Sequence, residues 1–306
     1  MTYRSAATLK YMLAAMVLAA AAGSPAGAVS DPAFDAFQRG HYLTALKEAE
    51  KAASRGEASA YTLMGRIYSE GLGVARDYRK ATQAYEKGAK LGDVEAEFAL
   101  GMLLAEGRGQ KKDLKRAADL FEKAANAGHS NAQYNLALIY IEGKTRGQDL
   151  KRAASLLRGA AEKGHVHAQY DLANLYSLGR GVARNDAVAA KWTERAADAG
   201  LADAELEYGI MLLNGRGVTK DAARGAHYLL SAASKGNPVA QNRLANLYAR
   251  GIGVKIDAGE AIKWHLLARE AGVSDFNLDL LLGSVSEPER EKAQRAAAKW
   301  RANNIQ

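Results

Sequence analysis

The stretch GLGVAR at residues 71–76 returns as GRGVAR at residues 179–184, 108 residues further along the chain. Paired glycines can form a loop whose backbone amides bind phosphate, so a nucleotide site is one interpretation of this motif. Since 108 is three times 36, the other interpretation is an internal repeat of 36 residues. The sequence between the two copies distinguishes these interpretations.

Three series of small residues recur every 36 residues without an insertion. One glycine closes each repeat, a second glycine lies near its middle, and an alanine lies near its start. The series are Gly56, Gly92, Gly128, Gly164, Gly200, Gly236 and Gly272; Gly71, Gly107, Gly143, Gly179, Gly215 and Gly251; and Ala60, Ala96, Ala132, Ala168, Ala204 and Ala240. A dinucleotide site needs a third glycine where Arg76 and Arg184 stand, and it follows a strand. We therefore interpret the glycines as turns of a repeat and expect no cofactor.

Each repeat has the pattern of two amphipathic helices. In the first helix, apolar residues recur at i, i+4, i+7 and i+8, as in Ala60, Met64, Ile67 and Tyr68. The second helix is expected to begin after Asp or Asn, because these side chains cap free amides at a helix start. The expected caps are Asp77, Asp113, Asp149, Asn185, Asp221 and Asp257. The sequence thus predicts an all-α fold of antiparallel helix pairs.

The first 28 residues have the layout of a secretory signal peptide. Arg4 and Lys10 precede an apolar run, and Ala26 and Ala28 form an A-x-A cleavage pattern. The alternative is an uncleaved anchor, but the run is too short to span a bilayer comfortably. We expect a mature chain that begins near Val29, is periplasmic or secreted, and has no stable membrane insertion after signal cleavage.

The rest of the chain divides according to the repeat. Residues 29–56 are expected to form N-terminal capping helices, residues 57–272 the six complete repeats, and residues 273–306 a degenerate C-terminal capping repeat. In this last segment Glu287, Pro288 and Glu289 replace the glycine loop.

Composition excludes several classes of function. Cysteine is absent, which excludes disulfides, thiolate zinc sites and cysteine nucleophiles. Loss of residues 1–28 removes two basic residues and no acid, so the net charge falls from +8 to +6. Acidic residues are interspersed with the basic ones, and we therefore expect no nucleic-acid partner.

Candidate chemical sites are few. His165 and His167 lie two residues apart and point to different sides of a helix, whereas helical metal pairs use i, i+4 spacing. We interpret them as residues at a helix start and expect no metal. No G-x-S-x-G nucleophile motif occurs, and no catalytic residue is expected.

The repeat resembles a known family. The stretch AQYNLALIYIEGKTRGQDLKRAASLLRGAAEKGH at residues 132–165 and its five sister copies resemble Sel1-like repeats, which are relatives of tetratricopeptide repeats. They share A-x-x-x-L-G/A-x-x-Y/L, then G-x-G-V, then D, then A-x-x-W/Y/L and A-A-x-x-G. Thr145 stands where the second loop glycine of the third repeat would be, so that loop is expected to have a different shape.

The resemblance implies a right-handed superhelical solenoid that binds proteins or peptides on its inner surface. Such repeats are common in bacterial envelope proteins of polysaccharide secretion and signalling, and in adaptors. We therefore expect a non-catalytic protein-protein interaction scaffold or regulatory adaptor in a cell-envelope process. The alternative is a hydrolase acting on cell-wall compounds or β-lactams, an activity ascribed to some proteins with this repeat.

A variable stripe on the first helices is the candidate partner-binding groove. Its members form i, i+4 pairs: Phe98 with Met102, Tyr134 with Leu138, Tyr170 with Asn174, and Leu206 with Ile210. Either the stripe packs one repeat against the next, or it lines a groove for an amphipathic helix or extended peptide. A polysaccharide is an alternative ligand for such a groove, since tyrosines can stack on sugar rings.

Charge changes along a neighbouring position of the repeat and would orient a partner. Glu70, Glu106 and Glu142 share this position, which becomes Leu178, Asn214 and Arg250 in the later repeats.

Overall fold

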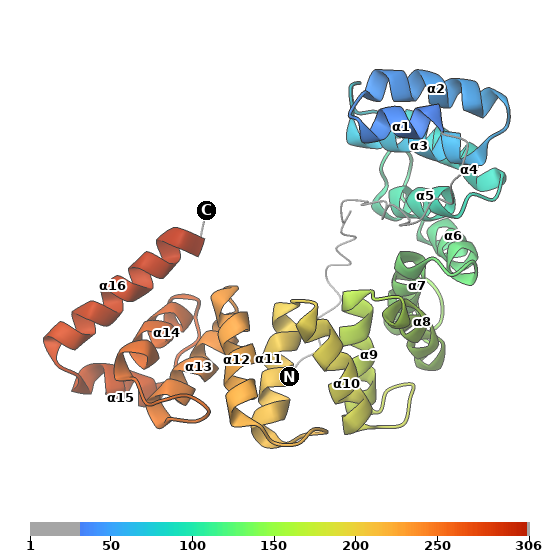
Figure 1. The fold of residues 1–306 in the computed structure, drawn as a ribbon. Helices are drawn as coiled ribbons and strands as arrows, with labels where there is room; N and C mark the ends of the chain where they lie inside the picture. Colours follow the sequence, from blue (N-terminus) through green and yellow to red (C-terminus); the bar gives the residue numbers. More distant parts are fainter. Residues whose placement is uncertain (1–30, 305–306) are drawn as a thin grey trace, which may run out of the picture. The chain divides into compact units, whose positions relative to one another are not determined.

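A computed structural model describes residues 31–304, which form α-helices joined by short connections (Figure 1). Within this range there is no strand. The predicted signal peptide, residues 1–28, lies outside the described residues. None of the described helices is both long and apolar enough to cross a membrane. The chain divides into two compact units, one up to Ala160 and one from Ala161.

Between residues 31 and 160, the N-terminal unit contains seven helices and most of an eighth, and neighbouring helices pack together from α1 to α7. They are α1 Pro32–Gln38, α2 Tyr42–Ser54, α3 Ala58–Glu70, α4 Tyr78–Lys90, α5 Val94–Glu106, α6 Leu114–Asn126, α7 Ser130–Glu142 and α8 Leu150–Glu162.

The C-terminal unit continues the same alternation of first and second helices. Its helices after α8 are α9 Val166–Leu178, α10 Asp186–Asp198, α11 Ala202–Asn214, α12 Ala222–Ser234, α13 Pro238–Arg250, α14 Ala258–Glu270, α15 Phe276–Ser284 and α16 Glu287–Asn304. The predicted all-α array of helix pairs is confirmed.

The boundaries of the helices follow the predicted signals. Each first helix ends at a glycine in the left-handed conformation, for example Gly71 with φ of 72°. This conformation is strained for other residues, which explains the mid-repeat glycine series. Each second helix begins after the expected cap: Asp77 accepts bonds from the amides of Arg79 and Lys80, both at 3.0 Å. The other five caps make the equivalent bond.

Small residues let the two helices of a repeat approach closely. A Cβ on Gly65 would lie 2.5 Å from the ring of Tyr85, and one on Gly101 would lie 2.6 Å from the ring of Phe121. Both rings are buried. The aromatic side chain of the second helix therefore packs directly onto the backbone of the first.

A side chain near the start of each first helix ties it to the preceding repeat. The Tyr61 hydroxyl donates to the carbonyl of Ala53, eight residues earlier, at 3.0 Å. In the third, fourth and sixth repeats a glutamine replaces the tyrosine and its amide makes the same contact, as in Gln241 to Ala233 at 3.2 Å. These bonds satisfy carbonyls at the end of the preceding helix.

The third loop differs from the others, as expected from Thr145. In the second, fifth and sixth repeats the second loop glycine has a positive φ and touches the backbone of the preceding repeat. A Cβ on Gly109 would lie only 2.3 Å from the carbonyl oxygen of Tyr78. In the third loop neither Thr145 nor Gly147 has a positive φ. Arg146 occupies the position of the loop valine, such as Val218, and extends toward α6 instead.

In the C-terminal cap, Glu287, Pro288 and Glu289 stand where the complete repeats have the glycine loop, and they form the first turn of α16. The reason is a capping box: the backbone amide and hydroxyl of Ser286 both donate to Glu289, at 3.1 and 2.7 Å. Proline is compatible with a first helical turn.

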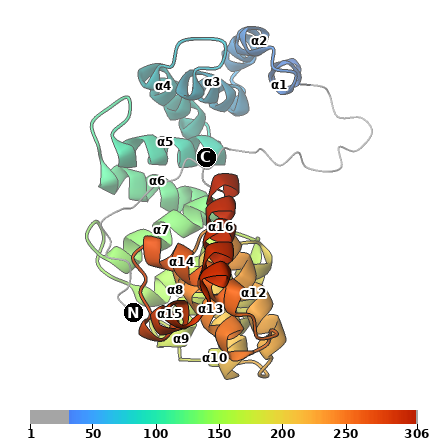
Figure 2. The same ribbon diagram turned by 90° about the vertical axis from the view of Figure 1, so that its left-hand side faces the viewer.

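Helix α16 packs along α14, while α15 makes a smaller contact with α14 (Figure 1 and Figure 2). The rings of Trp264 and Trp300 meet edge to face at 6.0 Å.

Candidate functional site

In the second repeat, the predicted stripe is part of the core. Phe98 and Met102 are each only 6% exposed. The Phe98 ring stacks on His129 at 4.5 Å and packs against Phe121 at 5.9 Å. His129 caps the first helix of the next repeat, so Phe98 joins two repeats. These two stripe residues are therefore not available to a partner.

The rest of the stripe is half-buried. Tyr134 and Leu138 lie on α7 and retain part of their surface. On α11, Leu206 packs against the core around Leu229 and Leu244, while Ile210 is half-buried. Here the stripe contributes to repeat packing and still presents a surface.

Tyr170 and Asn174 form a more polar pair on α9. Tyr170 is half-buried against the core of the following repeat, and Asn174 hydrogen-bonds its side chain. Burial and the nearby carboxylates of Glu207 and Asp203 raise the pKa of Tyr170 to about 12. The phenol therefore stays protonated and can donate a hydrogen bond at neutral pH.

The acidic position beside the stripe is compensated by neighbouring bases. Glu70 pairs with Arg66 at 2.9 Å. Glu106 pairs with Arg108 at 2.7 Å, and Glu142 with Lys144 at 2.9 Å. The predicted acidic end of the array is thus largely neutralised within the chain, and it provides less orientation of a partner than the sequence suggested.

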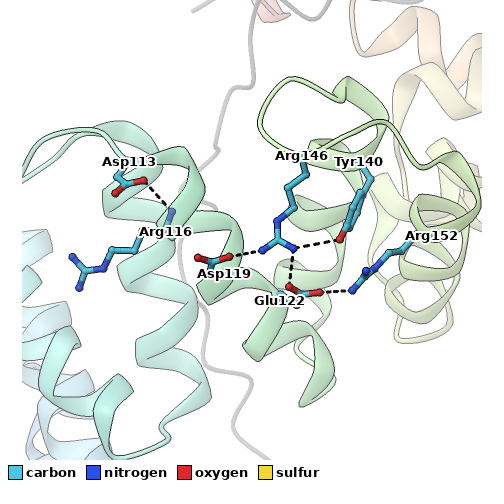
Figure 3. Close-up of polar contacts among 7 residues, drawn as sticks. All are labelled: Asp113, Arg116, Asp119, Glu122, Tyr140, Arg146 and Arg152. Atoms are coloured by element: carbon cyan, nitrogen blue, oxygen red, sulfur yellow. Dashed lines mark hydrogen bonds and ion pairs between the residues drawn. The ribbon is translucent and has the colours of Figure 1, made fainter.

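A cluster of ionisable side chains joins the second and third repeats (Figure 3). Arg146, in the loop after α7, donates to Asp119 at 2.5 Å and to Glu122 at 2.8 Å. Glu122 also pairs with Arg152 of α8, and the Tyr140 hydroxyl lies 3.5 Å from Arg146. Both carboxylates are held by arginines, so the cluster acts as a clamp between repeats and provides no free acid or base. The sequence signal for this cluster is an arginine in the position of a loop valine.

His165 and His129 act as helix caps, and His167 lies in the first turn of α9, in agreement with the interpretation of His165 and His167 as residues at a helix start. Nδ1 of His165 accepts the amide of Ala168 at 3.1 Å, and His129 caps Ala132 in the same way. Burial, followed by the neighbouring His167, lowers the pKa of His165 to about 4. Among residues 31–304 no cluster of three metal-ligating side chains occurs.

A buried histidine at the C-terminal end was not anticipated. His265 on α14 is fully buried, and its Nε2 lies 2.8 Å from a carboxylate oxygen of Asp279 on α15. Arg269 contacts the same oxygen at 3.3 Å. Because the imidazole is inaccessible, this pair fixes α15 to α14 and does not resemble a working catalytic dyad.

Comparison with known proteins identifies the repeat. The sequence matches the Sel1 repeat in six consecutive segments, residues 58–93, 94–129, 130–165, 166–201, 202–237 and 238–273. The chain belongs to the Sel1 repeat family. No curated protein matches the chain significantly.

Two solved structures support the same assignment. A Sel1 repeat protein from Oxalobacter formigenes is 26% identical, with a TM-score of 0.70 over 78% of this chain and 98% of that one. The protein c5321, a protective antigen of uropathogenic Escherichia coli strains with an SLR fold, is also 26% identical. Its TM-score is 0.59, over 89% of this chain and 68% of that one. Sel1 repeat proteins generally act as protein-interaction scaffolds.

Proposed function

We propose that this Sel1 repeat protein is a non-catalytic scaffold that binds a protein segment along its first helices. The surface comprises Tyr134 and Leu138 in the N-terminal unit and Tyr170, Asn174, Leu206 and Ile210 in the C-terminal unit. We call these residues, taken within each unit, the half-buried stripe. The observation that carries the proposal is that these aromatic, aliphatic and amide groups keep exposed area beside a well-packed core. Apolar anchors of this kind, flanked by hydrogen-bonding groups, suit an amphipathic helix or extended peptide.

The proposed setting is the cell envelope. Support comes from the layout of residues 1–28, which is that of an export signal. The Escherichia coli relative is described as a protective antigen. A polysaccharide remains a second ligand class for the tyrosines of the stripe.

No observation on the described residues favours a hydrolase. Asp119 and Glu122 are held by arginines, and His265 is fully buried. A general acid or base must reach its substrate, which the buried His265 imidazole cannot do, while Asp119 and Glu122 are engaged in ion pairs.

Site-specific photocrosslinking in the native envelope tests the stripe. A photoreactive residue at Leu138 or Ile210 is expected to yield the same covalent partner from both positions. The matched controls are Leu91 and Leu230, exposed leucines outside the stripe, where no such adduct is expected. Equal labelling from all four positions, or none from the stripe, would contradict the proposal.

A further inference from the structure

A cavity of about 520 Å³ lies near the C-terminal end of the array, within the C-terminal unit. Helix α16 contributes Trp300 to its wall, and α14 contributes Leu267 and Glu270. The remaining wall includes Ser234, Gly236 and Gln241, around the junction of α12 and α13. The volume falls in the range of about 300–1,000 Å³ that is usual for ligand pockets.

The preceding repeat shows what occupies the equivalent place. There the ammonium group of Lys235 donates to the carbonyl of Gly200 at 2.8 Å and to the carboxylate of Glu205 at 2.6 Å. The lysine follows the end of one second helix and binds the turn before the preceding first helix. It thereby fastens two neighbouring repeats.

One repeat later, the acceptors recur but the lysine is missing. Adding 36 to each number gives Gly236 for Gly200, Gln241 for Glu205, and Ala271 for Lys235. Gly236, Gln241 and Ala271 all line the cavity. The cavity thus corresponds to the space that a lysine side chain fills in the preceding repeat.

The acceptors in this cavity have no donor from the chain. Gln241 is 3% exposed, and its amide nitrogen is used by the carbonyl of Ala233. Nothing in residues 31–304 donates to the Gln241 carbonyl oxygen or to the carbonyl of Gly236. Gly236 is exposed, whereas the Gln241 side chain is buried, and acceptors without a donor from the chain suit a guest that brings hydrogen-bond donors.

The cations in the wall are already neutralised. Lys235 is engaged by Gly200 and Glu205, and Arg301 pairs with Glu270. These contacts leave the wall without an uncompensated positive charge that would repel a cationic guest.

Trp300 adds an aromatic group beside the open acceptors. A Cβ on Gly200 would lie 3.3 Å from the Lys235 ammonium, whereas a Cβ on Gly236 would lie 3.9 Å from the Trp300 ring. An ammonium ion near this ring would gain a cation–π interaction in addition to its hydrogen bonds.

We propose that this cavity is a socket for a primary alkylammonium group, namely a lysine side chain of a partner protein. The guest ammonium donates to Gly236 and Gln241, as Lys235 does to Gly200 and Glu205. Because the cavity is larger than one lysine side chain, adjacent backbone of the partner enters with it. This site goes beyond the half-buried stripe and uses none of its residues.

A short lysine peptide provides the test. The probe is acetyl-Gly-Lys-Gly-amide, and the readout is the indole N–H resonance of Trp300 in the folded mature chain, assigned with Trp300→Phe. We expect a saturable shift with the lysine peptide and at least about tenfold weaker binding with its Nε-acetylated form, since acetylation removes the charge and two donors. Equal binding of both peptides, or no shift with either, would overturn the proposal.

The decisive variant is Ala271→Lys, which supplies the missing lysine from the chain itself. We expect it to raise the thermal midpoint and to abolish the peptide-induced shift. Ala199→Lys is the matched control, because residue 199 has the same place in an earlier repeat and lies outside the cavity. Undiminished peptide binding to folded Ala271→Lys would also overturn the proposal. Crosslinking from Leu138 and Ile210 in this variant reports separately on the stripe, so the two proposals can fail independently.

Discussion

The second and fourth repeats differ in how deeply they bury the two stripe positions of the first helix. Phe98 and Met102 on α5 are buried, whereas Tyr170 and Asn174 on α9 are half-buried. The constant Ala and Leu positions of both helices are buried, as in Ala96 and Ala168. The difference teaches that the constant positions hold each helix pair together, while the variable stripe can either strengthen the contact between repeats or remain accessible to a partner.

Alanine substitutions give the largest expected difference between the two repeats. Phe98→Ala removes a buried ring packed on Phe121 and His129, so we expect a loss of about 3–5 kcal/mol in the free energy of unfolding. Tyr170→Ala removes a half-buried ring and is expected to cost about 1–2 kcal/mol. Urea denaturation followed by circular dichroism measures both. Equal losses would show that the two positions have the same structural role.

Reciprocal changes at the para position of the ring sharpen this comparison. Phe98→Tyr adds a hydroxyl at a buried position. It is expected to lower the free energy of unfolding by about 1–3 kcal/mol. Tyr170→Phe loses the hydrogen bond with Asn174 and is expected to cost about 0.5–1 kcal/mol. Crosslinking to the partner should weaken only for the Tyr170 variant. A neutral Phe98→Tyr would show that the second repeat accommodates an extra hydroxyl at this position.

The helix cap makes the fourth repeat sensitive to pH. His165 accepts a backbone amide through Nδ1, and protonation removes that acceptor. The pKa of His165 in the folded state, about 4, lies below the ordinary value of 6.5. Its contribution to the free energy of unfolding is therefore complete above pH 6.5 and is lost as the pH falls toward 4. Because the His165 side chain is partly exposed, we expect the free energy of unfolding to fall by roughly 1–2 kcal/mol over this interval.

Asparagine provides a cap that does not titrate, as Asn237 does at the same position of a later repeat. His165→Asn should therefore flatten the dependence of the thermal midpoint on pH between 6.5 and 4. The control is His227→Asn, an exposed histidine on α12. An unchanged slope in His165→Asn would assign the acid sensitivity to other groups.

Periodicity explains why so much of the fold was predictable. A glycine at a helix end and an aspartate at the next helix start act locally, so residues such as Gly71 and Asp77 mark the boundaries without knowledge of the tertiary structure. The start of α16 at Glu287 has a local signal too, the Ser286 capping box.

The candidate site was less predictable because burial of the stripe depends on contacts across repeats. Phe98 is buried by His129, 31 residues later, and sequence spacing alone does not reveal such a stack. The sequence does not predict the socket at Ala271 either, because the role of the equivalent residue Lys235 follows only from its contacts with Gly200 and Glu205 in the structure. Equivalent positions must be compared in space as well as in sequence.

Arg146 provides the smallest expected effect and tests how the second repeat is joined to the third. Its side chain replaces the loop valine and pairs with Asp119 and Glu122 of α6. Because these groups are partly exposed, a double-mutant cycle of Arg146→Ala and Glu122→Gln should give a coupling energy of about 0.5–1 kcal/mol, which decreases as salt is added. Arg224 and Glu194 form a comparable exposed pair between later repeats and serve as the reference cycle. A coupling no larger than that of the reference would mean that Arg146 adds no more than an ordinary surface ion pair, so that the second and third repeats are held together by apolar contacts such as Phe98 on His129.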